Sequence, residues 1–422
     1  MTLPEAFIEQ TRAVMGDDRF ARFLAAFDEE PPVSIRLNPM KTKVDEQLSG
    51  EAVPWCPLGT YLPSRPNFTF DPLFHAGCYY VQEAASMFLY EVLRQQIANS
   101  KLSNSKCLDL CAAPGGKSTL LRSLLPDDCV LYSNEPVRQR ASILLENITK
   151  WGHPNSIVTN NYPRDYRKSG LTFDLILCDV PCSGEGMFRR DPATIAEWSP
   201  QNVERCWQLQ RDIVSDAWQC LRPGGLLIYS TCTFNTKENE ENIRWMLEQY
   251  ADACVLPVAT RPEWHITGSL LEGFSQPVYR FIPGITRSEG LFVCVLRKEG
   301  QALAANEVST HAQGRKQNKK QAESQLKILS IPLPDKERSA KSTPENNISI
   351  PLTYPQAIAY LRGEALVLPA DAPRGLLTVD FMGHPLGLVK NIGTRANNLY
   401  PKEWRIKSTY IPKEYEAILR HT

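Results

Sequence analysis

The apolar positions of the chain follow two spacings that divide it into segments. Between residues 4 and 27 they recur at helical intervals, and this pattern ends at Pro31 and Pro32. From residue 106 onward, short apolar runs of strand length alternate with longer stretches of helical periodicity. This alternation predicts an α/β fold with a doubly wound, mostly parallel sheet. The six runs lie at 107–111, 130–132, 157–158, 173–178, 226–229 and 291–296.

The clearest helix is predicted at about residues 200–221. Ser199 is a suitable N-cap, Pro200 fits the first helical position, and apolar residues recur on one face. The glycine-rich sequence at 223–225 then stops the helix. The chain continues directly into the apolar run at 226–229, as an α/β unit requires.

Two changes in composition mark the ends of the α/β region. Residues 300–347 are rich in Gln, Ser, Asn, Lys and Ala, contain no aromatic residue and include the basic cluster 315–320, so a flexible linker is predicted there. Residues 348–422 recover a hydrophobic pattern, which predicts a small β-rich domain. The predicted organisation is an N-terminal segment at 1–105, an α/β domain at 106–299, a linker at 300–347 and a C-terminal domain at 348–422.

The charged residues are distributed unevenly although the formal net charge is zero. Residues 1–314 carry 30 Lys and Arg against 37 Asp and Glu, whereas residues 315–422 carry 17 against 10. A basic C-terminal region is compatible with a nucleic-acid partner.

The composition disfavours several classes of protein. The twelve cysteines are scattered, with no Cys-x-x-Cys and no Cys/His spacing typical of zinc, so neither a disulfide scaffold nor a metal site is expected. The first ten residues lack the basic and apolar regions of a secretory signal, and no apolar run has the length of a membrane span. We therefore expect a cytoplasmic protein without a metal and without membrane attachment.

An aromatic and proline-rich stretch at residues 51–75 allows two interpretations. If its rings are exposed beside the basic residues of this region, they form a stacking surface for unpaired bases. If they are buried, they belong to the core of the N-terminal segment. The sequence leaves both interpretations open. The aromatic residues are Trp55, Tyr61, Phe68, Phe70 and Phe74, and the basic residues are Arg36, Lys41, Lys43 and Arg65.

A glycine-containing turn follows the first run of the α/β region. Residues 109–118 read Asp-Leu-Cys-Ala-Ala-Pro-Gly-Gly-Lys-Ser, and glycines at a strand-to-helix turn let a ligand approach the backbone and the helix N-terminus. A phosphate-binding P-loop would need glycine where the chain has Cys111. Glu135, twenty residues after Gly115, is spaced to accept both hydroxyls of a ribose. Together these features indicate an adenosine cofactor, against the alternative of an ordinary turn and a surface glutamate.

Three polar side chains are predicted at the ends of two other strands. Asp179 and Cys182 follow the fourth apolar run, and Cys232 follows the fifth. In a doubly wound sheet these strands are neighbours with level carboxyl ends, so the three side chains should converge beside the glycine turn. Asn235 and Glu238 have the spacing of a capping box, which predicts a helix directly after Cys232. Taken singly, a cysteine is more often a buried structural thiol.

Covalent chemistry on a pyrimidine ring requires such a set of side chains. Carbon 5 of the ring is a poor nucleophile until a thiolate adds to carbon 6. A carboxyl group at ring nitrogen 3 stabilises the charge that develops during this addition. A base then removes the carbon 5 proton and the thiol leaves, a step that a second cysteine can assist. The combination of Asp179, Cys182 and Cys232 therefore favours alkylation of a pyrimidine.

Three segments taken together resemble the motifs of a known family. Residues 109–118, 179–186 and 230–234 are similar to motifs I, IV and VI of the S-adenosylmethionine-dependent RNA (cytosine-5) methyltransferases, the Sun/nucleolar-protein family. Residues 36–39 and 80–87 resemble the N-terminal signatures of that family. The resemblance implies a Rossmann-like methyltransferase domain that follows an N-terminal α+β segment, which positions RNA.

The resemblance also implies roles for individual residues. Cys232 corresponds to the nucleophile, Cys182 to the cysteine that assists its release, and Asp179 to an acid close to both cofactor and base. Glu135 corresponds to the acid that binds the ribose. S-adenosylmethionine is the implied cofactor. Its implied binding residues are Cys111, Ala112, Ala113, Pro114, Gly115, Gly116, Lys117, Glu135 and Asp179.

One segment departs from the family pattern. Many members have an aspartate after the third strand of the α/β domain, where the adenine is bound, but residues 159–163 contain no acid. We expect Asn161 or Tyr162 to meet the adenine instead.

The C-terminal region resembles the PUA-like RNA-binding tail of the RsmF-type ribosomal RNA methyltransferases, at residues 383–387, Lys390 and residues 398–405. This resemblance implies that the substrate is ribosomal RNA, with the RNA of the small subunit as the first choice. The implied product is 5-methylcytidine. The same reaction on transfer RNA is the nearest alternative. From other classes, a P-loop NTPase that uses Lys117 and a non-catalytic RNA-binding protein remain as rivals.

Overall fold

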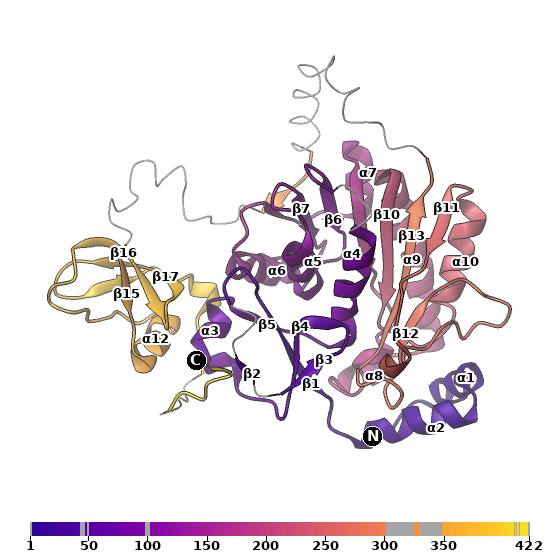
Figure 1. Cartoon of the computed structure of the whole chain (residues 1–422), viewed down its shortest axis with the longest axis horizontal. Coiled ribbons are helices and arrows are strands. Elements are labelled where there is room, and N and C mark those ends of the chain that lie inside the picture. Colours follow the sequence, from indigo (N-terminus) through magenta and orange to yellow (C-terminus); the bar gives the residue numbers. More distant parts are fainter. Residues whose placement is uncertain are drawn as a thin grey trace, which may run out of the picture.

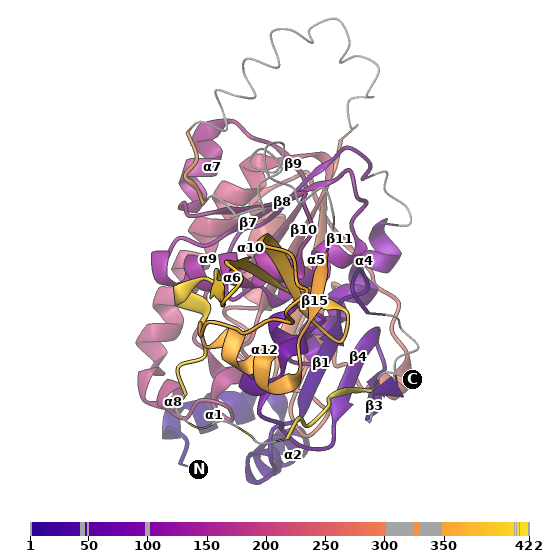
Figure 2. The same cartoon turned by 90° about the vertical axis from the view of Figure 1, so that its left-hand side faces the viewer.

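The computed structural model describes residues 2–42, 47–48, 50–97, 102–300, 325–329, 348–408, 410, 412 and 414–420. A large central sheet has helices on both faces, and an N-terminal unit lies against it (Figure 1). A small β domain from the C-terminal region sits at one side, beside α3 and α6 (Figures 1 and 2).

The central sheet has the strand order β11-β13-β10-β9-β6-β7-β8-β14, with β12 paired to β13. Strands β6 to β10 run parallel to one another, whereas β13 and β14 run antiparallel to their neighbours β10 and β8, and β11 and β12 pair antiparallel with β13. The expected α/β fold with a mostly parallel sheet is confirmed. The strands are β6 Lys106–Asp109, β7 Val130–Asn134, β8 Ser156–Thr159, β9 Phe173–Asp179, β10 Leu221–Thr231, β11 Ala253–Leu256, β12 Tyr279–Phe281, β13 Leu291–Lys298 and β14 Ile328–Leu329.

The order of the parallel strands reverses between β6 and β9. From β6 the chain proceeds through β7 and β8 on one side, and it returns to β9 and β10 on the other. In open sheets of this type the crevice at the carboxyl ends of the strands flanking such a reversal is where ligands bind. The topology therefore directs attention to the ends of β6, β9 and β10.

Alternate residues of the buried strands enter two separate cores. Leu175 and Leu177 pack into the core that α4 and α5 cover, whereas Ile176 and Cys178 pack into the core that α7, α9 and α10 cover. The helices are α4 Leu89–Ile97, α5 Gly116–Leu124, α6 Arg138–Trp151, α7 Pro163–Ser169, α8 Ala193–Glu197, α9 Pro200–Cys220 and α10 Glu240–Gln249.

The helix expected at about 200–221 is α9. The Ser199 side chain accepts a hydrogen bond from the N–H of Asn202, at 3.0 Å, and Pro200 occupies the first helical position as expected.

The N-terminal unit combines two helices with a sheet of order β3-β4-β1-β5. The helix pair reaches the α/β domain, where the Phe7 ring contacts Trp198 and the Phe23 ring contacts Phe234. Phe234 lies two residues after Cys232, so these helices support the chain next to that cysteine. The elements are α1 Glu5–Met15, α2 Asp17–Ala25, β1 Val33–Leu37, β3 Glu51–Val53, β4 Cys56–Leu62, α3 Pro72–His75 and β5 Tyr79–Val81.

The aromatic residues of the 51–75 stretch belong to the core, so their interpretation as a base-stacking surface is wrong. Four of the five rings are at most 8% exposed, and Phe74 is partly buried. The basic residues are also occupied: Arg36 is fully buried and donates to the Thr119 hydroxyl on α5, and Lys41 donates to the carbonyl oxygens of Ala76 and Lys150. Only Arg65 of the described basic residues is exposed, and Lys43 lies outside the described residues.

The C-terminal domain is a sheet of order β15-β16-β17-β18 with the helix α12, and it is docked on the N-terminal unit. Its core continues into that of the N-terminal unit, because residues from α12 and β16 share one hydrophobic cluster with Phe70 and Leu73. The Tyr354 hydroxyl donates to the Phe70 carbonyl at 3.2 Å, and β19 pairs with β2 of the N-terminal unit. The elements are β2 Gln47–Leu48, β15 Ser349–Pro351, α12 Tyr354–Leu361, β16 Gly375–Phe381, β17 His384–Asn391, β18 Ala396–Asn398 and β19 Leu419–Arg420.

Replacing Tyr415 by phenylalanine is expected to lower the free energy of unfolding by about 1–3 kcal/mol. The Tyr415 hydroxyl donates to the buried Asp71 carboxylate at 3.2 Å, across the contact between the two units. Urea denaturation followed by tryptophan fluorescence measures the loss. Tyr410→Phe is the matched control, because that side chain is 66% exposed. Equal stability of the Tyr415 variant and the control would show that this bond does not help to hold the docked domain.

Most of the predicted linker at 300–347 lies outside the described residues. Residues 325–329 are described, and they contain β14, which pairs with the edge strand β8. No helix in the described part of the chain is both long enough and apolar enough to cross a membrane.

Candidate active site

Strands β9 and β10 bring the two predicted cysteine turns to the same edge of the sheet. They are parallel neighbours, and Asp179 at the end of β9 lies opposite Ser230 near the end of β10. The chain leaves β9 through a turn at residues 180–187, called here the Cys182 turn. It leaves β10 through residues 232–239, called here the Cys232 turn.

The two sulfur atoms of these turns are within hydrogen-bonding distance. The Sγ atoms of Cys182 and Cys232 are 3.3 Å apart, well beyond the roughly 2.05 Å of a disulfide. The hydrogen bond to Cys232, together with burial, raises the pKa of Cys182 well above the ordinary thiol value. Cys182 therefore keeps its proton near neutral pH and is placed to donate it to Cys232.

Asp179 lies next to this thiol pair and is held from two sides. Its Oδ2 accepts from the Lys117 Nζ at 2.8 Å and its Oδ1 accepts from the Ser230 hydroxyl at 2.6 Å. Burial lowers the pKa of Lys117, but the contact with Asp179 and the nearby Cys232 and Asp109 raise it, and the net change is upward, so Lys117 stays protonated. In a P-loop the corresponding lysine binds phosphate, whereas Lys117 forms an ion pair with Asp179. This contact weakens the NTPase alternative.

The glycine turn is placed at the carboxyl end of β6, directly before α5. Gly115 has a φ of +120°, a conformation that L side chains rarely adopt. The Ala112 N–H donates to the Asn134 carbonyl at 2.7 Å, which ties the loop to β7. Residues 111–117 thus form a loop whose backbone leads into the N-terminus of α5, close to Asp179 through Lys117.

Asp109 at the end of β6 is fully buried beneath this loop. The Ser118 hydroxyl donates to its Oδ2 at 2.6 Å, whereas its Oδ1 has no hydrogen-bond partner. Burial raises the pKa of Asp109 to about 7, and the nearby Asp179 adds to the effect. An unpartnered buried oxygen is costly, so this atom is a natural acceptor for a ligand in the crevice.

Glu135 follows β7 at the same edge. Its carboxylate accepts from the Val137 N–H at 3.0 Å and forms an ion pair of 3.4 Å with Arg140. A carboxylate can accept about four hydrogen bonds, so these contacts leave capacity for ribose hydroxyls.

The two residues expected at the adenine, Asn161 and Tyr162, lie in different surroundings. The Asn161 side chain donates to the Lys327 carbonyl at 3.2 Å and accepts from the Lys327 N–H at 2.9 Å, so its amide binds the backbone just before β14. Tyr162 is 57% exposed, with Arg164 against its ring. The polar groups of Asn161 are therefore occupied, and Tyr162 lies on the surface.

We expect Asn161→Asp to release residues 325–329 from the sheet edge. An aspartate keeps the acceptor for the Lys327 N–H, but it cannot donate to the Lys327 carbonyl and places negative charge against it. A loss of about 1.4 kcal/mol corresponds to roughly tenfold faster amide exchange in this segment, measured by hydrogen–deuterium exchange mass spectrometry. Lys327→Gln is the control, because it removes an exposed bond to Asn160. Unchanged exchange in Asn161→Asp would contradict this account.

The capping box predicted from Asn235 and Glu238 is only partly correct. The Asn235 side chain does accept from the Glu238 N–H, at 2.8 Å, but α10 begins later, at Glu240. Glu238 is fully buried and accepts from the Ser183 N–H on the Cys182 turn instead of from the Asn235 backbone. A contact between distant parts of the chain thus replaces the local cap.

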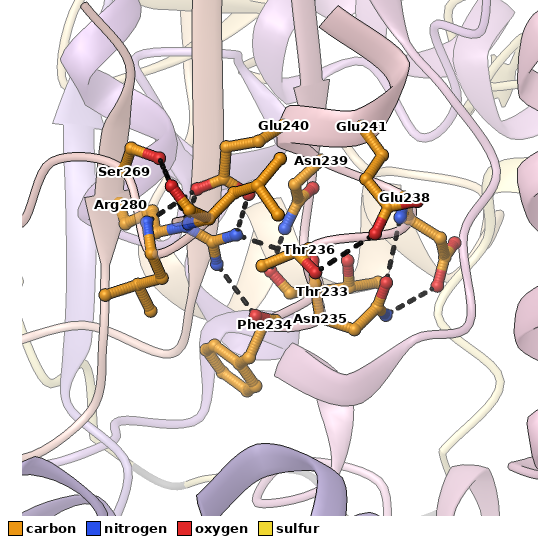
Figure 3. A network of polar contacts seen from close by, with 12 residues as sticks. Thr233, Phe234, Asn235, Thr236, Glu238, Asn239, Glu240, Glu241, Ser269 and Arg280 are labelled. Atoms are coloured by element: carbon orange, nitrogen blue, oxygen red, sulfur yellow. Dashed lines mark hydrogen bonds and ion pairs between the residues drawn. The ribbon is translucent and has the colours of Figure 1, made fainter. Parts of the chain in front are cut away.

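Sequence reasoning missed two charged residues that contact the Cys232 turn, Glu185 and Arg280. Glu185 accepts from backbone N–H groups of this turn. Arg280 donates to its carbonyl groups while paired with Glu240 (Figure 3). The signal for Arg280 was one arginine inside the short apolar sequence 278–282. Glu185 had a weaker signal, as an acid between two glycines.

Among the described residues there is no group of three or more His, Cys, Asp or Glu side chains that could hold a metal ion.

Comparison with known proteins agrees with this arrangement. Residues 97–297 match the family described as 16S rRNA methyltransferase RsmB/F, residues 3–84 match the N-terminal domain of 16S rRNA methyltransferase RsmF, and residues 347–406 match the methyltransferase RsmF PUA domain. Ribosomal RNA small subunit methyltransferase F of Escherichia coli O9:H4 (strain HS) is 30% identical in an alignment of 472 positions, gaps included, that covers 95% of this chain and 96% of that protein. The chain belongs to the RsmB/F methyltransferase family.

Other RsmB/F relatives and a solved structure extend the comparison. Ribosomal RNA small subunit methyltransferase F of Pectobacterium atrosepticum is 34% identical in an alignment of 323 positions, gaps included, that covers 71% of this chain. The match spans 63% of that relative, which is less than two thirds of its length. A methyltransferase homologue from Pyrococcus horikoshii has 27% identity and a TM-score of 0.58, over 70% of this chain and 95% of that one. The resemblance of the sequence motifs to this family is thereby confirmed.

Proposed function

We propose that this chain transfers a methyl group from S-adenosylmethionine to carbon 5 of a cytidine in ribosomal RNA, through a covalent bond between Cys232 and the base. The observation that carries the proposal is the 3.3 Å contact between Cys182 and Cys232, with Asp179 beside them at the ends of β9 and β10. Two half-buried thiols and a carboxylate at a ligand-binding edge suit covalent pyrimidine chemistry.

In the first step the Cys232 thiolate adds to carbon 6 of the cytosine. This addition forms a carbon–sulfur bond and moves electron density to carbon 5, which then acts as the nucleophile. Asp179 is the acid or hydrogen-bonding group for ring nitrogen 3, where it stabilises the charge that the addition generates. Its two contacts, to Lys117 and Ser230, fix the direction of its carboxylate.

In the last step the carbon 5 proton is removed, the ring double bond re-forms, and the Cys232 sulfur leaves carbon 6. Cys182 assists this release because it holds a proton that it can give to the departing sulfur. The raised pKa of Cys182 and its hydrogen bond to Cys232 support this role.

The glycine turn fits an adenosine cofactor. S-adenosylmethionine supplies an electrophilic methyl group when it is bound. Residues 111–117 would hold it through their backbone and the α5 N-terminus, and Glu135 would accept from the ribose. The left-handed Gly115 and the unpartnered Oδ1 of the buried Asp109 support this assignment.

Ribosomal RNA is the proposed substrate, because the relatives are named ribosomal RNA small subunit methyltransferases and the C-terminal region matches their PUA domain. We infer that the docked C-terminal domain contacts RNA through its exposed basic residues, which include Arg374, Lys390 and Arg395. Transfer RNA is the alternative substrate for the same chemistry. A cytoplasmic location stays a prediction.

Two measurements test the proposal. Equilibrium dialysis with S-adenosylmethionine and with ATP separates a methyltransferase from a P-loop protein, and binding of ATP alone would overturn the cofactor assignment. Bisulfite mapping of ribosomal and transfer RNA from a strain that lacks the protein identifies the target. Loss of 5-methylcytidine from ribosomal RNA is expected, whereas loss from transfer RNA alone would replace the proposed substrate.

A further inference from the structure

Two buried glutamates connect the Cys182 turn to the Cys232 turn. Glu185 belongs to the first turn and Glu238 to the second, and each accepts hydrogen bonds from the backbone of the other turn. We propose that Glu185 and Glu238 are positioning residues that hold Cys182 and Cys232 at the spacing needed for methyl transfer. The inference rests on the proposed function for its role in the reaction, but the spacing itself can be tested separately.

Glu185 is bonded through both carboxylate oxygens. Its Oε2 accepts from the N–H groups of Phe234 and Asn235, at 2.6 and 3.1 Å. Its Oε1 accepts from the Asn235 amide at 2.9 Å and from the Trp198 indole N–H at 3.1 Å. Three of these four donors belong to the Cys232 turn. The carboxylate is nearly inaccessible to solvent, so its bonds are charge-assisted in a low-dielectric setting.

Glu238 makes the reverse connection. Its Oε2 accepts from the Ser183 N–H at 3.0 Å, directly after Cys182, and from the Gln210 amide of α9 at 2.6 Å. Its Oε1 accepts from the Asn235 amide at 2.9 Å. The nitrogen of the Asn235 side chain therefore donates to both glutamates and places them in one network.

The backbones of the two turns also touch directly. The Gly186 N–H donates to the Cys232 carbonyl at 2.7 Å. A Cβ atom at Gly186 would lie 2.5 Å from that carbonyl oxygen, so only glycine permits this approach. Together the glutamate bonds and this contact set the separation of the two turns.

The Cys232 turn is held from its other side by a separate ion pair. Arg280 on β12 donates to the Phe234 carbonyl at 2.8 Å and to Glu240, and Figure 3 shows these contacts beside Asn235 and Glu238. With one side of the turn fixed in this way, the position of Cys182 relative to Cys232 depends on the glutamates.

The charge of Glu238 also bears on the protonation of Cys182. Its negative charge contributes to the raised pKa of Cys182, after the bond to Cys232 and burial. Burial raises the pKa of Glu238 itself to about 7, and Glu185 adds to this increase. The titratable groups that face Glu238 are Glu185 and Cys182 on the Cys182 turn, Cys206 on α9 and Tyr229 on β10.

The first test uses Glu185→Gln and Glu238→Gln in the full chain, with Glu91→Gln as the matched control. Glu91 is a buried glutamate bonded to Arg94 on α4, remote from both turns. A glutamine keeps the size of the side chain but turns an N–H group toward other donors. We expect kcat to fall at least 100-fold in both variants, with KM for RNA and the Kd for S-adenosylmethionine changed less than threefold. A kcat within threefold of the wild-type value in both folded variants would overturn the proposal.

The second test measures the spacing without RNA or cofactor. Oxidised glutathione converts the two thiols to a disulfide and is itself reduced to two molecules of glutathione. Peptide mass spectrometry follows formation of the Cys182–Cys232 disulfide. We expect it to form at least tenfold more slowly in Glu185→Gln and Glu238→Gln than in the wild-type chain and in Glu91→Gln. Equal rates of disulfide formation in the variants and the wild-type chain would overturn the positioning role. If the variants form the disulfide more slowly but the wild-type chain does not methylate RNA, only the proposed function is contradicted.

If a glutamine variant fails to fold, Glu185→Asp replaces it. The aspartate keeps the charge but is one methylene shorter, so it cannot reach all the donors that bind Glu185. The spacing of the two turns should therefore change. The same slower disulfide formation is expected, and a wild-type rate would contradict the proposal.

Discussion

Replacing Cys232 by alanine is expected to abolish methyl transfer, with kcat reduced by about 10⁴-fold or more, because the substitution removes the proposed nucleophile for carbon 6. The measurement is transfer of a labelled methyl group from S-adenosylmethionine to RNA. Cys254→Ala is the control, since Cys254 is a half-buried thiol on β11, away from the crevice. Cofactor binding should be unchanged in both variants. Methyl transfer at the wild-type rate in Cys232→Ala would rule out the covalent mechanism.

The corresponding Cys182 variant should behave differently. Cys182→Ala removes the proton donor but leaves the nucleophile, so the covalent protein–RNA adduct should form and persist while turnover falls by about 10²–10³-fold. Denaturing gel electrophoresis with labelled RNA detects this adduct. If Cys232→Ala accumulated the adduct and Cys182→Ala did not, the roles of the two cysteines would be reversed.

The parts of the fold that follow from local periodicity could be predicted. Two apolar runs, which end at Cys178 and at Tyr229, are continuous because their strands are buried on both faces. The doubly wound topology predicts that these two strands are adjacent in the sheet, as they are. The helix at α9 has a distinct start and stop, so it was also predictable. The expectation that Asp179, Cys182 and Cys232 lie at one edge of the sheet follows from these features, whereas the spacing of the two cysteines does not.

Features set by contacts between distant residues could not be predicted. Asn235 and Glu238 have the spacing of a local cap, but the partner of Glu238 is Ser183 on another turn. The proline-rich stretch at 51–75 has no regular period, so the burial of Trp55 or Phe70 could not be read from it. Strand β14 is a two-residue element in a polar segment, and it owes its conformation to pairing with β8.

The pairing of β2 with β19 has a consequence for synthesis of the chain. Leu48 pairs with Leu419, and the apolar surface around Phe70 and Leu73 is covered by residues that follow position 348. At about 5–20 residues per second, roughly 20 to 70 seconds separate translation of the two strands. During that interval the N-terminal unit presents an unpaired edge and an uncovered apolar face to the solvent. Its folding is therefore post-translational at this site, however early the α/β domain forms.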